Sequence, residues 1–177
     1  MGADASKMKL RDPDEAILDA EIGCALYPTT KAAGHVQTLR NQLQEIMWDD
    51  VGVMRTSQGM TRGLDRLDAL ENELMETGVD GTNLAFNLTW HDWLNMRSLL
   101  DISKAITIAG LKRENSRGAH FREDFPDEGD LETSQFTVAR LENDEITVEN
   151  HPVEFSIVKP GETILPEGEP ESLVEIA

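Results

Sequence analysis

The sequence predicts a mainly α-helical fold, a three-helix up-down-up bundle with a small β-hairpin and strand extension at the C-terminus. Two observations support this prediction. Apolar residues recur with a helical period of about 3.6 in three long segments between residues 35 and 126, and the connections between these segments are short. After residue 126 the apolar residues alternate in short runs, which is typical of strands. The bundle expected from this pattern is spectrin-repeat-like.

Length and charge limit the classes of protein to which this chain can belong. Its 177 residues, 39% of them hydrophobic, are enough for one sizeable core. The formal net charge of -18 disfavours nucleic acid and anionic lipid as partners. There is no apolar run of about 18 residues, and residues 1–11 lack an apolar stretch, so we expect neither a membrane span nor a secretory signal. The single cysteine, Cys24, fits a reducing compartment, and we therefore expect a cytoplasmic location.

Residues 1–34 are expected to form a lead-in followed by a short helix. Asp12 is the expected N-cap with Pro13 as the first helical residue, and Tyr27-Pro28 should end the helix. The residues expected on its apolar face are Ile17, Ala20 and Cys24. Cys24 is therefore predicted to be a small buried hydrophobic residue rather than a reactive thiol.

Two long helices should follow. The apolar residues of the first are Val36, Leu39, Leu43, Ile46, Met47 and Val51. Ser57 is a plausible N-cap for the second, which should end at Thr77-Gly78. The apolar residues of the second are Met60, Leu64, Leu67, Leu70 and Leu74.

The third long helix should begin near Thr89, a possible N-cap. Its apolar residues, from Trp90 to Leu111, occupy more than one helical face, so we expect this helix to be buried between its neighbours.

Beyond residue 126 the sequence predicts an acidic loop, a hairpin and one further strand. Phe136 and Val138 precede Asn143-Asp144, and Ile146 and Val148 follow it, as in a hairpin. The alternating residues 153–158 should form another strand. The expected organisation is a lead-in and helix (1–34), a bundle (35–126), a β-rich extension (127–165) and an acidic tail (166–177).

Few residue patterns indicate catalysis. His35, His91, His120 and His151 share no metal-ligand spacing, and one cysteine cannot form a cysteine pair. Neither a serine-histidine-aspartate arrangement nor a G-x-G-x-x-G turn occurs. We therefore predict no catalytic, cofactor-binding or metal-binding residue in this chain.

The stretch from Glu114 to Pro126 combines arginine, histidine and carboxylate side chains around Gly118. One interpretation is a helix C-cap, in which Gly118 ends the third helix and basic residues complement its dipole. The other is a docking site, in which arginine donors bind carboxylates or carbonyls.

The same stretch resembles the S-R-G-A-H-x-R-x-D-[YF]-P signature near the C-terminus of the flavoprotein subunits of succinate dehydrogenase and fumarate reductase. The matching residues are Ser116, Arg117, Gly118, Ala119, His120, Arg122, Asp124, Phe125 and Pro126. Upstream, the run from Leu39 to Arg55 is similar to the family's L-x-x-x-L-Q-x-x-M-W-x-x-V-G-[IV]-x-R pattern. The resemblance covers about residues 12 to 165.

This resemblance implies the C-terminal helical domain and β-rich tail of an FAD-dependent oxidoreductase. In that family FAD and the dicarboxylate are bound by other domains, so this chain alone should bind no FAD and be inactive. The implied partners are the flavin-binding domain and, in a complete complex, an iron-sulfur subunit that could hold the enzyme at the cytoplasmic membrane. The residues expected at the domain interface are Arg117, His120, Arg122, Asp124, Trp48 and Arg55. For Trp48, packing within the bundle is the competing interpretation.

Two alternatives remain open. L-aspartate oxidase has a similar run, typically with Leu-His where this chain has Ala119-His120 and without the arginine that follows. The run Arg122-Glu123-Asp124 therefore favours the succinate and fumarate group. The other alternative is a helical protein-interaction module that acts without a catalytic domain.

Overall fold

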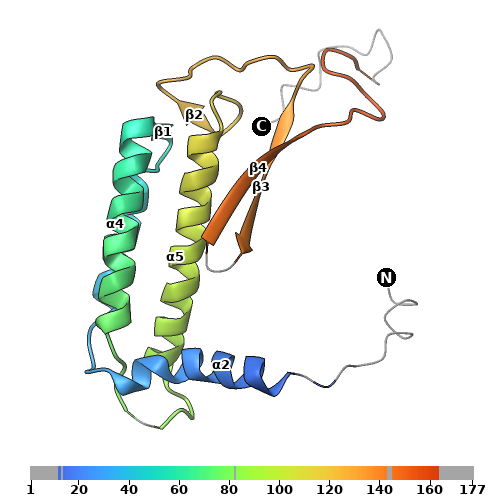
Figure 1. Ribbon diagram of the computed structural model, residues 1–177. Coiled ribbons are helices and arrows are strands. Elements are labelled where there is room, and N and C mark those ends of the chain that lie inside the picture. The colour runs from blue at the N-terminus through green and yellow to red at the C-terminus, as the bar shows by residue number, and fades with distance from the viewer. Residues whose placement is uncertain (1–11, 13, 82, 143–144, 164–177) are drawn as a thin grey trace, which may run out of the picture. The chain divides into compact units, whose positions relative to one another are not determined.

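The computed structural model describes residues 12, 14–81, 83–142 and 145–163. Within these residues the chain is mainly helical, as the sequence predicts (Figure 1). The helices are α2 (Glu15–Leu26), the 3-10 helix η1 (Tyr27–Thr30), α3 (Val36–Asp49), α4 (Ser57–Glu76) and α5 (Leu88–Lys112). The strands are β1 (Met54–Arg55), β2 (Phe121–Arg122), β3 (Gln135–Glu142) and β4 (Glu145–Pro152). The three long helices and the hairpin of the prediction are therefore present.

The chain divides into two compact units. The first comprises Met1–Met47 and Asp65–Ser103, and the second comprises Trp48–Leu64 and Lys104–Ala177. The four-part organisation expected from the sequence stays a prediction, as does the up-down-up arrangement.

The core of the first unit is built from one face of each long helix, because the buried residues recur three or four positions apart. They are Val36, Leu39, Leu43, Ile46, Leu67, Leu70, Leu74, Val79, Trp93, Met96 and Leu100. The indole of Trp93 donates hydrogen bonds to the carbonyls of Leu74 (3.1 Å) and Thr77 (2.8 Å), which satisfies its buried N–H group. These bonds join α5 to the C-terminal end of α4.

The N-terminal helix differs from the prediction in two respects. Asp14, not Asp12, is the N-cap, and its carboxylate accepts a hydrogen bond from the backbone N–H of Ala16 (3.0 Å); Pro13 lies outside the described residues. The predicted burial of Cys24 is wrong, because Cys24 is exposed and α2 has no buried residue at all. The predicted end of the helix before Tyr27-Pro28 is confirmed.

Two expectations for α5 are also wrong. Its first turn is capped by Asn87, whose side chain accepts a hydrogen bond from the N–H of Trp90 (3.0 Å), so Thr89 lies inside the helix. The helix is not buried on several faces, because Ile102 and Ile106 are exposed. Its buried positions instead follow a single stripe with three- and four-residue spacing.

The second unit contains both two-stranded sheets. Strands β1 and β2 pair in parallel, and β3 and β4 form an antiparallel hairpin in which Glu142 lies opposite Glu145. The predicted turn residues Asn143-Asp144 lie outside the described residues. The further strand expected at residues 153–158 is wrong, since this segment is irregular and Ile157 is 88% exposed. An alternating pattern forms a strand only where a neighbouring backbone pairs with it.

Candidate functional site

The signature residues begin after α5 has ended, so the C-cap interpretation of Gly118 is wrong. Helix α5 ends at Lys112, six residues earlier. Arg117 and His120 instead exchange two backbone hydrogen bonds, of 2.9 and 3.1 Å. Gly118 has a φ of +57° and is the first central residue of this tight turn, where positive φ favours glycine.

Ser116 ties the two sides of the signature together. Its hydroxyl accepts a hydrogen bond from the N–H of Arg122 (2.8 Å) and donates one to the carbonyl of Phe125 (2.8 Å). Its backbone N–H donates to the carbonyl of Asp127 (2.9 Å). The loop is therefore held in shape by a buried serine, which the sequence analysis matched to the family signature but did not count among the interface residues.

Arg122 is fully buried, and all five of its N–H groups have acceptors. Its guanidinium binds the carboxylate of Asp124 through two bonds, Nε to Oδ1 (2.7 Å) and Nη2 to Oδ2 (2.8 Å). The remaining acceptors are the hydroxyl of Ser57 and the carbonyls of Gly110, Leu111 and Arg113. Because those carbonyls end α5, Arg122 places a positive charge at the negative end of the helix dipole.

Asp124 connects this arginine to the start of α4. Its Oδ2 accepts hydrogen bonds from the backbone N–H (2.7 Å) and the hydroxyl (2.6 Å) of Ser57, the first residue of α4. The hydrogen bonds from Arg122, followed by those from Ser57, hold the pKa of the Asp124 carboxyl well below its usual range. The carboxylate is thus ionised at neutral pH, and with Arg122 it joins the end of α5 to the beginning of α4.

Strands β1 and β2 lie side by side (Figure 1), and Arg122 is the second residue of β2. Met54 pairs with Phe121, and Arg55 pairs with Arg122. The N–H of Glu123 then donates to the carbonyl of Arg55 (2.9 Å). The two motifs that resemble the oxidoreductase family therefore meet as neighbouring strands, although about 65 residues separate them.

His120 binds Arg55 in a way that defines its protonation. Arg55 Nη1 lies 2.7 Å from His120 Nδ1, and because a guanidinium can only donate, Nδ1 is the acceptor. The proton is therefore on Nε2, which lies 3.3 Å from the carbonyl of Arg113 and donates to it. Burial is the main cause that lowers the pKa of His120, and the positive charges of three arginines add to it: Arg113, Arg55 and Arg122. Near neutral pH the imidazole is neutral.

Arg117 organises the acidic loop that follows the signature. Its guanidinium donates hydrogen bonds to the carbonyls of Glu128 and Asp130 and to the hydroxyl of Ser134. These bonds fold the loop backbone around the arginine. Arg117 thus acts within the second unit, and its side chain is partly buried.

Four exposed apolar side chains of the second unit lie on β1 and β2 or shortly before β1 in the sequence, and we call them the end patch: Trp48, Val53, Met54 and Phe121. Trp48 is 79% exposed, so the interpretation that it packs within the bundle is wrong. Met54 and Phe121 are in register on β1 and β2, which puts their side chains side by side. Of these four residues the sequence analysis named only Trp48 as an interface residue, because a local pattern cannot show the pairing of Met54 with Phe121.

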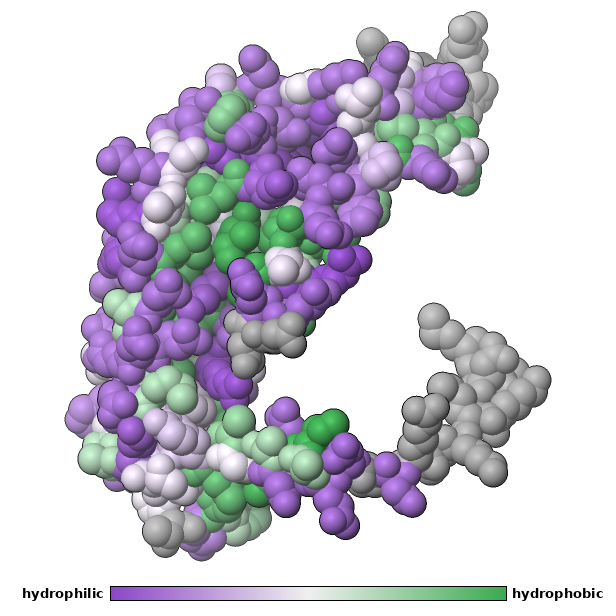
Figure 2. All heavy atoms as spheres, in the orientation of Figure 1, coloured by the Kyte–Doolittle hydropathy of each residue, from purple (hydrophilic) through white to green (hydrophobic). Residues whose placement is uncertain are grey.

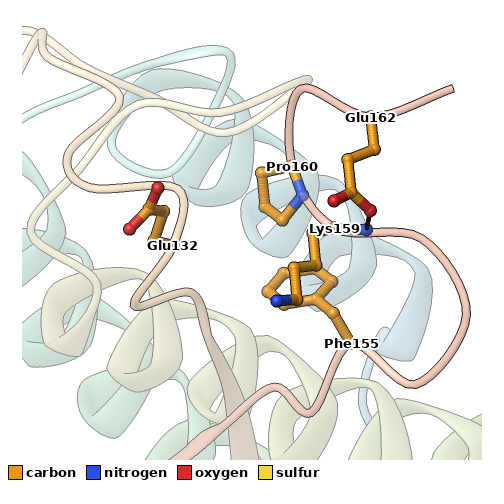
Figure 3. A pocket seen from close by; sticks show the side chains of 5 residues that line it. All are labelled: Glu132, Phe155, Lys159, Pro160 and Glu162. Atoms are coloured by element: carbon orange, nitrogen blue, oxygen red, sulfur yellow. Dashed lines mark hydrogen bonds between the residues drawn. The ribbon is translucent and has the colours of Figure 1, made fainter.

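The residues that the structure describes do not form a site that fits FAD. A dinucleotide site needs a glycine-rich turn between a buried strand and a helix. Here the described parallel strands are two residues long, and β1 leads into α4 through Thr56 alone. Two larger cavities of the second unit offer no alternative. One, of about 580 Å³, is lined by Ile108, Leu111, Lys112, Glu114, Val148 and Asn150. The other, of about 420 Å³, lies beside Phe155 and Lys159 (Figure 3). Neither contains a predicted site residue.

In the part of the chain that the structure describes, no three histidine, cysteine or carboxylate side chains gather as metal ligands. Within the same residues, no helix has the length and apolar character needed to cross a bilayer. The network around Arg122 joins β2 to the start of α4 and to the end of α5.

The chain is similar to known proteins in sequence and in structure. Residues 40–165 match the sequence profile of the family described as "Fumarate reductase flavoprotein C-term". The fumarate reductase flavoprotein subunit of Mycobacterium tuberculosis is 29% identical over 130 residues, which are 73% of this chain and 22% of that protein. An FAD-dependent oxidoreductase of Methanocaldococcus jannaschii is 30% identical over 93 residues, 52% of this chain and 16% of the relative.

A solved structure is also similar. In the Mycobacterium smegmatis Sdh1 complex in the apo form, one chain superposes with a TM-score of 0.73 and 27% identity, covering 88% of this chain and 27% of that one. This chain therefore spans about a quarter or less of the length of the relatives named here.

Proposed function

The chain belongs to the fumarate reductase flavoprotein C-terminal family, and on this premise we propose that it is the C-terminal structural domain of an FAD-dependent oxidoreductase of the succinate dehydrogenase and fumarate reductase type. In this proposal it packs against the flavin-binding domain and is inactive without it. The flavin-binding domain supplies FAD and the dicarboxylate site. An iron-sulfur subunit is a further partner, and the assembly is cytoplasmic or peripheral at the cytoplasmic membrane.

The observation that carries the proposal is the end patch together with the network behind it. Exposed tryptophan, methionine and phenylalanine side chains, two of them paired on neighbouring strands, are characteristic of the central part of a protein interface. Short strands alone would be mobile, but the contacts of Arg122 and Asp124 fix both of them. A surface that is rigid before binding loses less conformational entropy on binding.

Within this proposal the six predicted interface residues have different tasks. Trp48 contacts the flavin-binding domain directly. Arg55 and His120 border the end patch, and Arg117 shapes the acidic loop. Arg122 and Asp124 act by holding the strands in place. The three long helices form the up-down-up bundle that supports them.

The test is reconstitution with a separately produced flavin-binding domain of a related fumarate reductase or succinate dehydrogenase. We expect a complex whose flavin absorbance near 450 nm co-elutes with this chain, and restored fumarate reduction or succinate oxidation. Replacing both Trp48 and Met54 by alanine should weaken binding by at least about tenfold, or 1.4 kcal/mol. The matched control is Ile157→Ala, another exposed aliphatic residue of the second unit, which should bind normally.

The alternative of an independent interaction module gives a different result. Such a module would bind none of the related flavin-binding domains, and the Trp48 and Met54 variant would then change nothing in this assay. That outcome would contradict the proposed function.

A further inference from the structure

Helix α2 has the composition of a buried helix, but its side chains are exposed. Ile17, Leu18 and Ile22 are 61%, 43% and 54% exposed, and α2 has no buried residue. Figure 2 shows hydrophobic and hydrophilic side chains mixed along this helix. A helix of 12 residues is marginal in water by itself, and large aliphatic side chains on it favour a covering surface.

Only the C-terminal end of α2 is attached within the first unit. The indole of Trp90 donates a hydrogen bond to the carbonyl of Ala25 (2.7 Å), and the ring of Tyr27 lies 6.4 Å from that of Trp93. Pro28, which follows Tyr27 in the chain, is buried. This attachment holds the C-terminal end of α2 on the first unit. The residues from Ala16 to Gly23 are exposed.

The charges on α2 indicate what kind of surface can cover it. Leu18 and Ile22 are one turn apart and share one face, while Ile17 and Cys24 are two turns apart and share the opposite face, so the covering surface must enclose α2 on both sides. All charged residues from the N-cap to the end of the helix are acidic: Asp14, Glu15, Asp19 and Glu21. Two copies of α2 packed together would bring these like charges close, which is unfavourable. The complementary surface is apolar with lysine or arginine at its rim.

We propose that α2 is a second docking element, which binds an apolar surface with a basic rim on the flavin-binding domain. This inference rests on the proposed function. The fumarate reductase flavoprotein subunit of M. tuberculosis matches this chain over only 22% of its length, so in such a protein most of the polypeptide is available to provide that surface. Helix α2 itself precedes residues 40–165, the part that matches the family profile. The contact of α2 with the flavin-binding domain would therefore be separate from the contact made by the end patch.

The chain has a built-in reporter of this contact, because its single cysteine lies on α2 and is exposed. We would measure alkylation of Cys24 by iodoacetamide, identified by peptide mass spectrometry, in the chain alone and with the flavin-binding domain. Alkylation should be fast in the chain alone and slow in the complex. In parallel, replacing Leu18 and Ile22 by glutamate should weaken the complex at least about tenfold. Leu88→Glu, at an exposed leucine of the same unit, is the control and should leave affinity unchanged.

The possible outcomes separate this inference from the proposed function. If the complex forms but Cys24 reacts at its original rate and the double variant binds normally, α2 is not a docking element, although the proposed function stands. If the wild-type chain binds no related flavin-binding domain, both are contradicted. Concentration-dependent protection of Cys24 in the chain alone would identify a second copy as the partner. Protection by anionic lipid vesicles alone would identify a membrane. Either result would overturn the inference.

Discussion

Arg122 is the residue on which the second unit depends most. A buried guanidinium is tolerated only when a carboxylate and further acceptors replace water. Here Asp124 supplies the charge, and Ser57 with three backbone carbonyls supplies the other acceptors. A single side chain thus joins β2 to both α4 and α5.

Removing the carboxylate should therefore be costly. We expect Asp124→Ala to lower the free energy of unfolding by about 3 kcal/mol, because it leaves the buried charge of Arg122 without its partner. The measurement is urea unfolding followed by circular dichroism. The control is Glu123→Ala at the neighbouring exposed position, which should change stability by less than about 0.5 kcal/mol. Equal effects of the two substitutions would contradict the role given to this pair.

His120 gives a pH dependence of definite sign. Its pKa is lower in the folded chain than the ordinary 6.5, so the unfolded chain binds the proton more readily. The contribution of neutral His120 is fully present above pH 6.5 and is lost as pH falls through the folded value. His120→Gln should remove this part of the dependence, since an amide can also accept from Arg55 and donate to Arg113. We would compare the unfolding free energies at pH 7.5 and 5. If the unfolding free energy falls by the same amount between pH 7.5 and 5 in the wild type and in His120→Gln, His120 does not cause the pH dependence.

At the scale of elements, the sequence predicted most of the helices and strands. It did not predict which of their faces are covered by other parts of the protein. Helices α3, α4 and α5 and the hairpin were predictable because their apolar residues keep one period over many residues. The caps were misplaced because neighbouring residues compete for the role, as Asp12 does with Asp14 and Thr89 with Asn87. Periodicity could not show that α2 is uncovered.

The candidate site was predictable only in part, and for a similar reason. Local motifs identified Arg55, Arg117, His120, Arg122 and Asp124, but not which of these residues contact one another. The hydrogen bond between His120 and Arg55 joins positions 65 residues apart. A pattern within a short stretch of sequence cannot reveal a contact between such distant positions. Met54 and Phe121 likewise become neighbours only through the pairing of β1 with β2.

Two glycines on elements of the first unit should respond oppositely to alanine. A side chain at Gly78 would collide with the backbone carbonyl of Lys31, so Gly78→Ala should destabilise by about 1–3 kcal/mol. At Gly23, within α2, a Cβ would meet no heavy atom within 4 Å, and Gly23→Ala should stabilise the helix by about 0.5–1 kcal/mol. Thermal unfolding of both variants measures the difference. A stable Gly78→Ala protein would contradict the close approach of these segments.

At the scale of the whole molecule, the net charge of -18 should make stability depend on salt. Repulsion among uncompensated carboxylates disfavours the compact state, and the Debye length falls from about 10 Å at 0.1 M salt to about 3 Å at 1 M. Exposed ion pairs, such as Lys31 with Glu76, contribute little to stability, so their screening by salt lowers stability only slightly. We expect the thermal midpoint to rise between 0.05 and about 1 M sodium chloride. A falling midpoint would mean that ion pairs outweigh repulsion.

The central claim, that this chain docks through the end patch as the structural domain of a flavoenzyme, is tested most directly by amide hydrogen exchange of the complex with a flavin-binding domain. The chain alone should exchange faster at residues 48–55 and 117–124 than the same chain in the complex. The hairpin residues 135–142 provide an internal reference within the same unit. Protection confined to the hairpin, or unchanged exchange throughout, would contradict the claim.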